Sequence, residues 1–76
     1  MKNYNQIIQN LLIMLNAMSG FTVDEQQLIG HLQLQKLSLI DVWELQDVVI
    51  LDKSMSLENK NTLLILLKNN QNLIIK

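Results

Sequence analysis

The chain has 76 residues, a formal net charge of −1, no cysteine and a 49% share of hydrophobic residues. A chain of this length makes one domain, and its stability must come from packing because no disulfide is available. All six basic residues are lysines spread along the sequence, whereas a nucleic-acid binder gathers lysine and arginine on one face. We therefore expect a single domain over residues 1–76 whose main partner is not a nucleic acid.

The apolar residues come in short runs. The longest are residues 11–15 and 63–67, far from the roughly 18 residues that a membrane-spanning helix needs. Polar residues also interrupt the segment that would form the core of a signal peptide. The sequence therefore predicts a cytoplasmic protein without a membrane span.

The first predicted element is an amphipathic helix over residues 4–18. Apolar side chains recur there at helical spacing, opposite a face of asparagine and glutamine. Ser19 and Gly20 are expected to end it, because glycine readily adopts the left-handed conformation of a helix C-terminal cap.

A long first loop is predicted to follow. Thr22 and Glu25 have the spacing of a capping box, so residues 23–29 are expected to form one short helical turn. Gly30 is expected to end that turn, and the chain would then run extended through Leu34.

The second main helix is predicted over residues 37–51, which are strongly apolar. Ser38 with Asp41 three residues later is a start signal, because a serine can cap the helix and an acid suits its first turn. Asp41, Glu44 and Asp47 lie three residues apart and should share one side of this helix.

Two further helices complete the prediction. A short third helix is expected over residues 56–60 after Ser56, and a last one over residues 62–72 with Thr62 as its cap. The fold class is therefore all-α, a four-helix bundle with a long first loop and a short third helix. The expected core consists of Ile8, Leu11, Leu15, Leu28, Leu34, Val42, Leu45, Val49, Leu63 and Leu66.

The stretch from Leu32 to Leu37 resembles the signature of acyl, aryl and peptidyl carrier proteins, which reads Leu-Gly-Leu-Asp-Ser-Leu before an amphipathic helix. Leu32, Leu34 and Leu37 fall on its three leucines. Gln33 replaces the glycine, Gln35 the aspartate, and Lys36 the serine that carries phosphopantetheine. The later Lys-Asn-Thr-Leu stretch, residues 60–63, is also similar to one in carriers.

This resemblance implies a carrier-protein-like domain with a degenerate phosphopantetheine site and no cofactor. Lys36 has no hydroxyl to receive the arm, and a lysine at a helix start opposes the helix dipole. Ser38 is an alternative attachment residue in a shifted frame, but capping the helix explains it better.

The resemblance also implies docking on a partner enzyme or module of polyketide, fatty-acid or nonribosomal-peptide biosynthesis. Recognition would use the second helix, where apolar residues and acids would meet a basic patch. The expected partner-binding residues are Leu37, Ile40, Asp41, Trp43, Glu44 and Asp47. The alternative is a small helical regulatory or interaction protein that homodimerises through exposed apolar surface, so both monomer and homodimer remain open.

Little in the sequence supports catalysis. His31 is the single histidine, and no carboxylate stands at helical spacing to orient it. The acids of the second helix are better explained as a solvated face than as a metal site. We therefore expect a protein that is not an enzyme and binds no metal.

Overall fold

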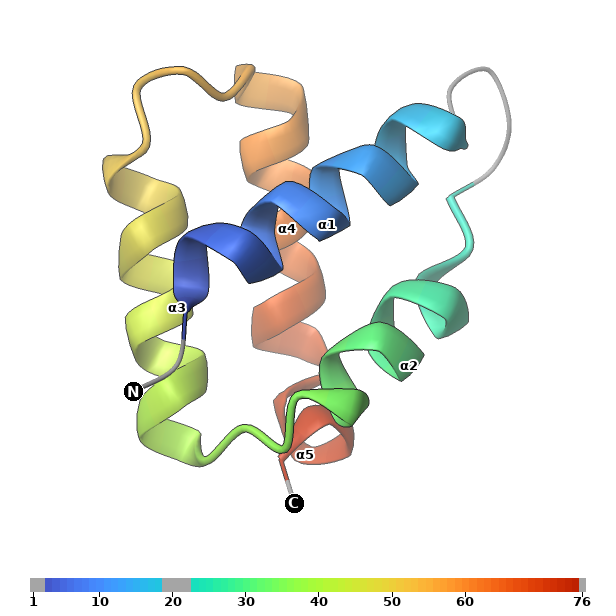
Figure 1. Cartoon of the computed structure of the whole chain (residues 1–76), viewed down its shortest axis with the longest axis vertical. Coiled ribbons are helices and arrows are strands. Elements are labelled where there is room, and N and C mark those ends of the chain that lie inside the picture. The colour runs from blue at the N-terminus through green and yellow to red at the C-terminus, as the bar shows by residue number, and fades with distance from the viewer. Residues whose placement is uncertain (1–2, 19–22, 76) are drawn as a thin grey trace.

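The computed structural model describes residues 3–18 and 23–75, which form five helices and no strand (Figure 1). The helices are α1 (Tyr4–Ala17), α2 (Glu25–Leu34), α3 (Leu39–Leu51), α4 (Leu57–Asn69) and α5 (Gln71–Ile74). The all-α prediction is confirmed. None of the helices in the described part of the chain is long and apolar enough to cross a membrane.

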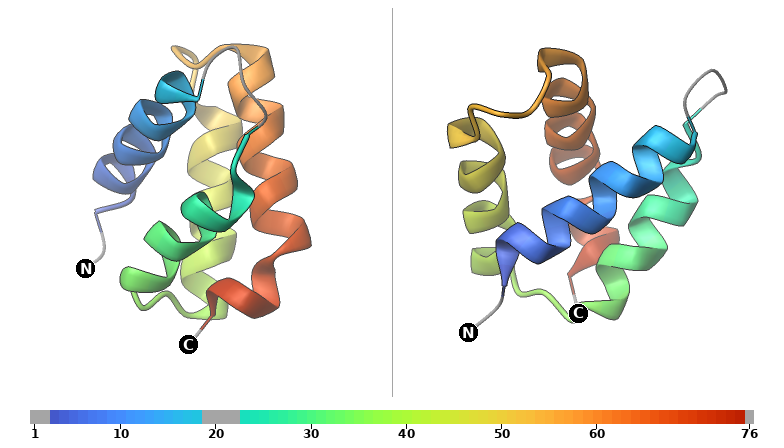
Figure 2. Two further views of the ribbon diagram at one scale, coloured as in Figure 1. Left: turned by 90° about the vertical axis from the view of Figure 1, so that its right-hand side faces the viewer. Right: turned by 45° about the horizontal axis from the view of Figure 1, so that its top comes forward.

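Helices α3 and α4 form a pair, and α1 and α2 lie on one side of it (Figure 1). α3 and α4 run side by side, and α1 crosses in front of them (Figure 1). α2 lies next to α1 on the same side of this pair, and α5 lies beneath the end of α4, as the turned view of Figure 2 also shows. α3 therefore lies at the edge of the molecule, with helices on only part of its circumference.

The connection between α3 and α4 is fixed by polar bonds. Oδ1 of Asp52 accepts bonds from the Ser54 hydroxyl at 2.7 Å, the Ser54 backbone N–H at 2.8 Å and the Met55 N–H at 3.1 Å. These bonds, those from Ser54 first, lower the pKa of the Asp52 carboxyl. Nζ of Lys60 donates to the carbonyls of Ile50 and Asp52, at 3.2 and 2.6 Å, and so satisfies acceptors that a helix end leaves open.

The core is made of aliphatic side chains from all five helices. Nine of the ten predicted core residues are buried, so the inward stripes of α1, α3 and α4 were assigned correctly. Leu34 is wrong, because its side chain is 79% exposed. It stands two positions after buried Leu32, about 200° round the helix, and so points outward.

The long first loop is also a wrong prediction, because α2 occupies residues 25–34. Asp24 caps it by accepting a bond from the N–H of Gln27 at 3.2 Å. Gly30 lies inside the helix instead of ending it, since packing of the α2 apolar side chains outweighs a glycine cost of roughly 0.5–1 kcal/mol. The predicted cap at Thr22, like the predicted helix end at Ser19 and Gly20, lies outside the described residues.

The predicted third and fourth helices are one helix, α4, followed by the short α5. Ser56 caps α4 as expected, its hydroxyl oxygen accepting from the N–H of Asn59 at 3.2 Å. Thr62 caps nothing, because its hydroxyl donates to the carbonyl of Glu58 within the helix, at 2.9 Å. With no proline between residues 56 and 62, nothing interrupts the helical hydrogen bonds there.

Candidate functional site

α3 is apolar on two opposite faces. Its inner face carries Val42, Leu45 and Val49, which are fully buried. Its outer face carries four large apolar side chains that remain in solvent: Ile40 (62% exposed), Trp43 (52%), Ile50 (54%) and Leu51 (75%). In a globular protein the apolar side of a helix normally packs against another element. The exposed half of α3 is therefore the feature of this structure that calls for a function.

The exposed side chains are aligned along the helix. Ile40, Trp43 and Ile50, with the acid Asp47 among them, have the spacing three, four, three, which keeps residues on one side of an α-helix. Leu51 continues the line four residues after Asp47. We call these five residues the outer stripe. α3 has 13 residues, so the stripe runs along a helix about 20 Å long.

Ile40, Trp43 and Asp47 of the predicted partner-binding residues lie in the outer stripe, Asp41 and Glu44 lie on its flank, and Leu37 is not on the surface. Its side chain is fully buried, so assigning it to the docking surface was wrong. The reason is that α3 begins at Leu39, which leaves Leu37 in the connection from α2, from where it enters the core. Ile50 and Leu51 were missed, although the spacing from Ile40 onward would have revealed them.

The N-terminus of α3 is capped by Ser38 as predicted. The N–H of Asp41 donates to the Ser38 hydroxyl oxygen at 3.2 Å, and the Ser38 N–H donates to Asp41 Oδ2 at 2.8 Å. This is the reciprocal capping box, which satisfies two otherwise unpaired donors.

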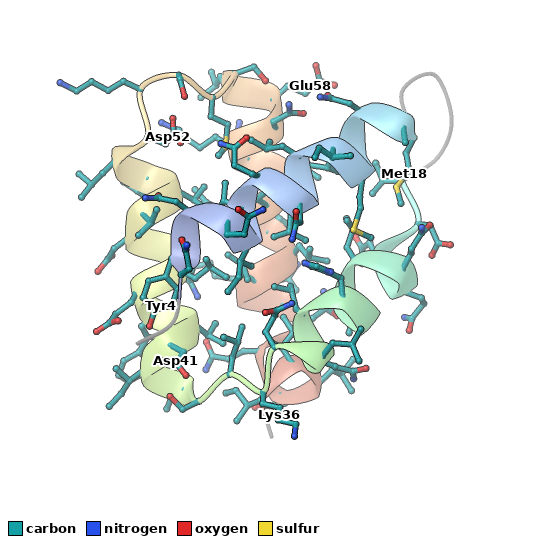
Figure 3. All side chains as sticks on the ribbon, in the orientation of Figure 1. Tyr4, Met18, Lys36, Asp41, Asp52 and Glu58 are labelled. Atoms are coloured by element: carbon teal, nitrogen blue, oxygen red, sulfur yellow. The ribbon has the colours of Figure 1, made fainter. Side chains whose placement is uncertain are left out.

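Two of the three acids of α3 hold α1 in place. The hydroxyl of Tyr4 in α1 donates to Glu44 Oε2 at 2.7 Å and to Asp41 Oδ1 at 2.9 Å, and Figure 3 shows Tyr4 beside Asp41. Bonding to Glu44, then partial burial, then bonding to Asp41 raise the pKa of the Tyr4 hydroxyl. We call this group of three residues the tyrosine clasp.

The three predicted acids therefore differ in what they do. Asp41 and Glu44 serve as acceptors within the fold, on the flank of α3 that faces α1. Asp47 lies in the outer stripe, and no hydrogen bond or ion pair engages its side chain among the described residues. The spacing of the acids showed that they share one side of the helix. The clasp, in contrast, joins Tyr4 to Glu44, which is 40 residues away in sequence, and no sequence pattern predicts that contact.

Lys36 lies at the end of α2 rather than at the start of a helix, so the predicted conflict with a helix dipole is wrong. Its backbone is left-handed, with φ 54°, and its N–H donates to the carbonyl of Gln33 at 3.2 Å. This is how helices commonly end, although glycine is the usual residue. A positive charge at a helix C-terminus is favourable, because it complements the helix dipole. The Lys36 side chain points away from the tyrosine clasp (Figure 3).

The remaining candidates for chemistry are few. Nε2 of His31 is buried and has no hydrogen-bond partner among the described residues. Nor do those residues contain a group of three or more histidine or acidic side chains able to hold a metal ion.

Comparisons with protein-family models, with curated proteins and with solved structures found no match. The function is therefore inferred from the geometry of α3 and its neighbours.

Proposed function

We propose that this chain is a non-catalytic binding domain that docks on a protein partner through the outer stripe of α3. The observation that carries the proposal is the row of exposed apolar side chains at Ile40, Trp43, Ile50 and Leu51, which no other part of the described chain covers. Exposed apolar surface gathered on one face marks interaction sites, and tryptophan is among the residues enriched in strong interface anchors.

The charge of α3 favours a partner with a basic docking surface. Asp47 lies in the stripe and Glu44 on its flank, while the helix itself contains no lysine. Complementary charge across an interface mainly sets orientation and association rate, whereas the apolar anchors determine how long the complex lasts.

We extend the proposal to the class of partner that the carrier-protein resemblance implies, a cytoplasmic biosynthetic enzyme or module, with the domain lacking the phosphopantetheine arm. Lys36 and Gln35 support the loss of the arm, since neither has a hydroxyl, and Ser38 is engaged in the capping box. Incubation with coenzyme A and a promiscuous phosphopantetheinyl transferase should leave the intact mass unchanged. An increase by the mass of one arm would contradict this part of the proposal.

Photo-crosslinking tests the docking itself. A photoreactive amino acid is placed at position 43 and, as a control, at position 13, where Ile13 is an exposed apolar residue of α1. In the native host, position 43 should form a crosslink to one discrete protein and position 13 should not. Crosslinking that is equal at both positions, or absent at position 43, would overturn the proposal.

A matched pair of variants makes the result specific to the stripe. Ile50 in α3 and Ile65 in α4 are both 54% exposed. Ile50→Glu should abolish the crosslink from position 43, while Ile65→Glu should leave it intact. A crosslink to a second copy of the chain, with a dimer in light scattering, would favour the homodimer instead.

A further inference from the structure

We infer that the segment that covers the outer stripe is a single amphipathic helix carrying a lysine or arginine within its own apolar stripe. This inference rests on the proposed function and specifies the partner of the same surface.

The shape of the stripe is the first reason. Its residues follow the three-four-three spacing on one straight helix, and the helix stands at the edge of the molecule (Figure 1). Side chains in this spacing form a narrow ridge that packs along the groove of a second helix, as in two-stranded helical packing. The surface is therefore suited to one helix lying along α3.

The position of Asp47 is the second reason. It follows Trp43 by four residues and precedes Ile50 by three, so a helix lying on those two side chains also covers its carboxylate. Covering a carboxylate without a partner is costly, because the charge loses its water. A lysine or arginine opposite Asp47 offsets that cost, and its aliphatic stem adds apolar contact with the stripe.

A second copy of this chain would not meet that requirement. Pairing α3 with its own copy about a twofold axis brings both Asp47 carboxylates into one apolar seam. Residues 39–51 contain neither lysine nor arginine to pair with them. Like charges facing each other at an interface cost binding energy, so the charge of the stripe favours a different chain.

Two synthetic peptides of about 18 residues, each held helical by a staple on its polar face, test the inference. They share one leucine-rich stripe and differ at its central position, which is lysine in one and glutamate in the other. Trp43 is the only tryptophan and lies in the stripe, so its fluorescence reports occupancy directly. The lysine peptide should shift the Trp43 emission to the blue and bind at least about tenfold more tightly than the glutamate peptide.

Charge exchange provides the decisive control. Asp47→Lys should reverse the preference, so that the glutamate peptide binds the variant more tightly. Ile50→Glu should weaken both peptides, and Ile65→Glu neither. Circular dichroism of each variant confirms that the helices are retained.

The outcomes separate this inference from the proposed function. Equal binding of both peptides, or no reversal in Asp47→Lys, would overturn the charge requirement while leaving docking on the stripe intact. If neither peptide binds although position 43 crosslinks to a partner, the partner does not present a helix, and the inference is wrong.

Discussion

Apart from Asp47, the two faces of α3 are both built from apolar side chains, yet their environments are opposite. Val42, Leu45 and Val49 on the inner face are fully buried, whereas the outer stripe remains in solvent. The difference comes entirely from the neighbours, since α1 and α4 pack on one side of α3 and no described element packs on the other. An apolar side chain on α3 therefore contributes to stability on one face and is available for binding on the other.

The largest effect should come from the inner face. Leu45→Ala removes a fully buried side chain and should lower the free energy of unfolding by about 2–5 kcal/mol, because it loses apolar burial and leaves a cavity. Leu51→Ala, at 75% exposure, is the matched control and should change it by no more than about 0.5 kcal/mol. Urea denaturation measures both, and similar losses in the two variants would remove the distinction between the faces.

The next largest effect should come from the N-terminal cap of α3, because both faces belong to this one helix. Ser38→Ala removes the capping acceptor for the Asp41 N–H and should cost about 1 kcal/mol. Ser38→Asn keeps an acceptor and should be close to wild type in the same urea measurement. An equal loss in both variants would mean that the hydroxyl does not stabilise the helix as a cap.

The tyrosine clasp should give an effect that depends on pH. The neutral hydroxyl is favoured in the folded chain, so the pKa of Tyr4 is raised there. Its contribution to stability is therefore complete below the ordinary tyrosine pKa of about 10 and is lost as the pH rises through the folded-state value. Tyr4→Phe should be less stable than wild type at neutral pH, and the difference should shrink above about pH 10.

Tyr4 is the only tyrosine, so its ultraviolet absorbance follows this ionisation directly. Ionisation should occur at higher pH in the folded chain than in urea. Lysines titrate in the same range, but they are common to both proteins and cancel in the comparison with Tyr4→Phe. Identical titration curves with and without urea would show that the clasp does not form in solution.

The smallest effect on stability is expected at the largest side chain of the chain. Trp43→Ala should change the free energy of unfolding by about 1 kcal/mol or less, because half of the tryptophan is already in solvent. In wild type, iodide should quench its fluorescence. A loss of about 2 kcal/mol or more would place Trp43 in the core and move the docking surface elsewhere.

The sequence predicted what depends on local spacing. The Ser38 cap and the inward stripes of α1, α3 and α4 were correct, because capping and helical periodicity act within a few residues. Trp43, expected on the partner-binding side, is also exposed, because it lies about 100° round the helix from the buried Val42.

The predictions that failed concern residues at which tertiary packing outweighs local sequence preferences. Gly30 was expected to end a turn, but Leu28, Ile29 and Leu32 are buried and keep α2 continuous through it. Continuity then turned Leu34 outward, although it had been assigned to the core. The tyrosine clasp joins residues far apart in the chain, and no spacing rule relates them.

The bonds from Lys60 to the carbonyls of Ile50 and Asp52 also bear on the entropy of binding. Helix ends usually fray, and the last residues of the outer stripe lie at such an end. Because Lys60 of α4 bonds to the carbonyls at that end, we expect the backbone under Ile50 and Leu51 to be ordered before a partner arrives. Ordering mobile groups on association costs affinity, and preorganisation lowers that cost. Lys60→Met would therefore weaken binding without touching the docking surface.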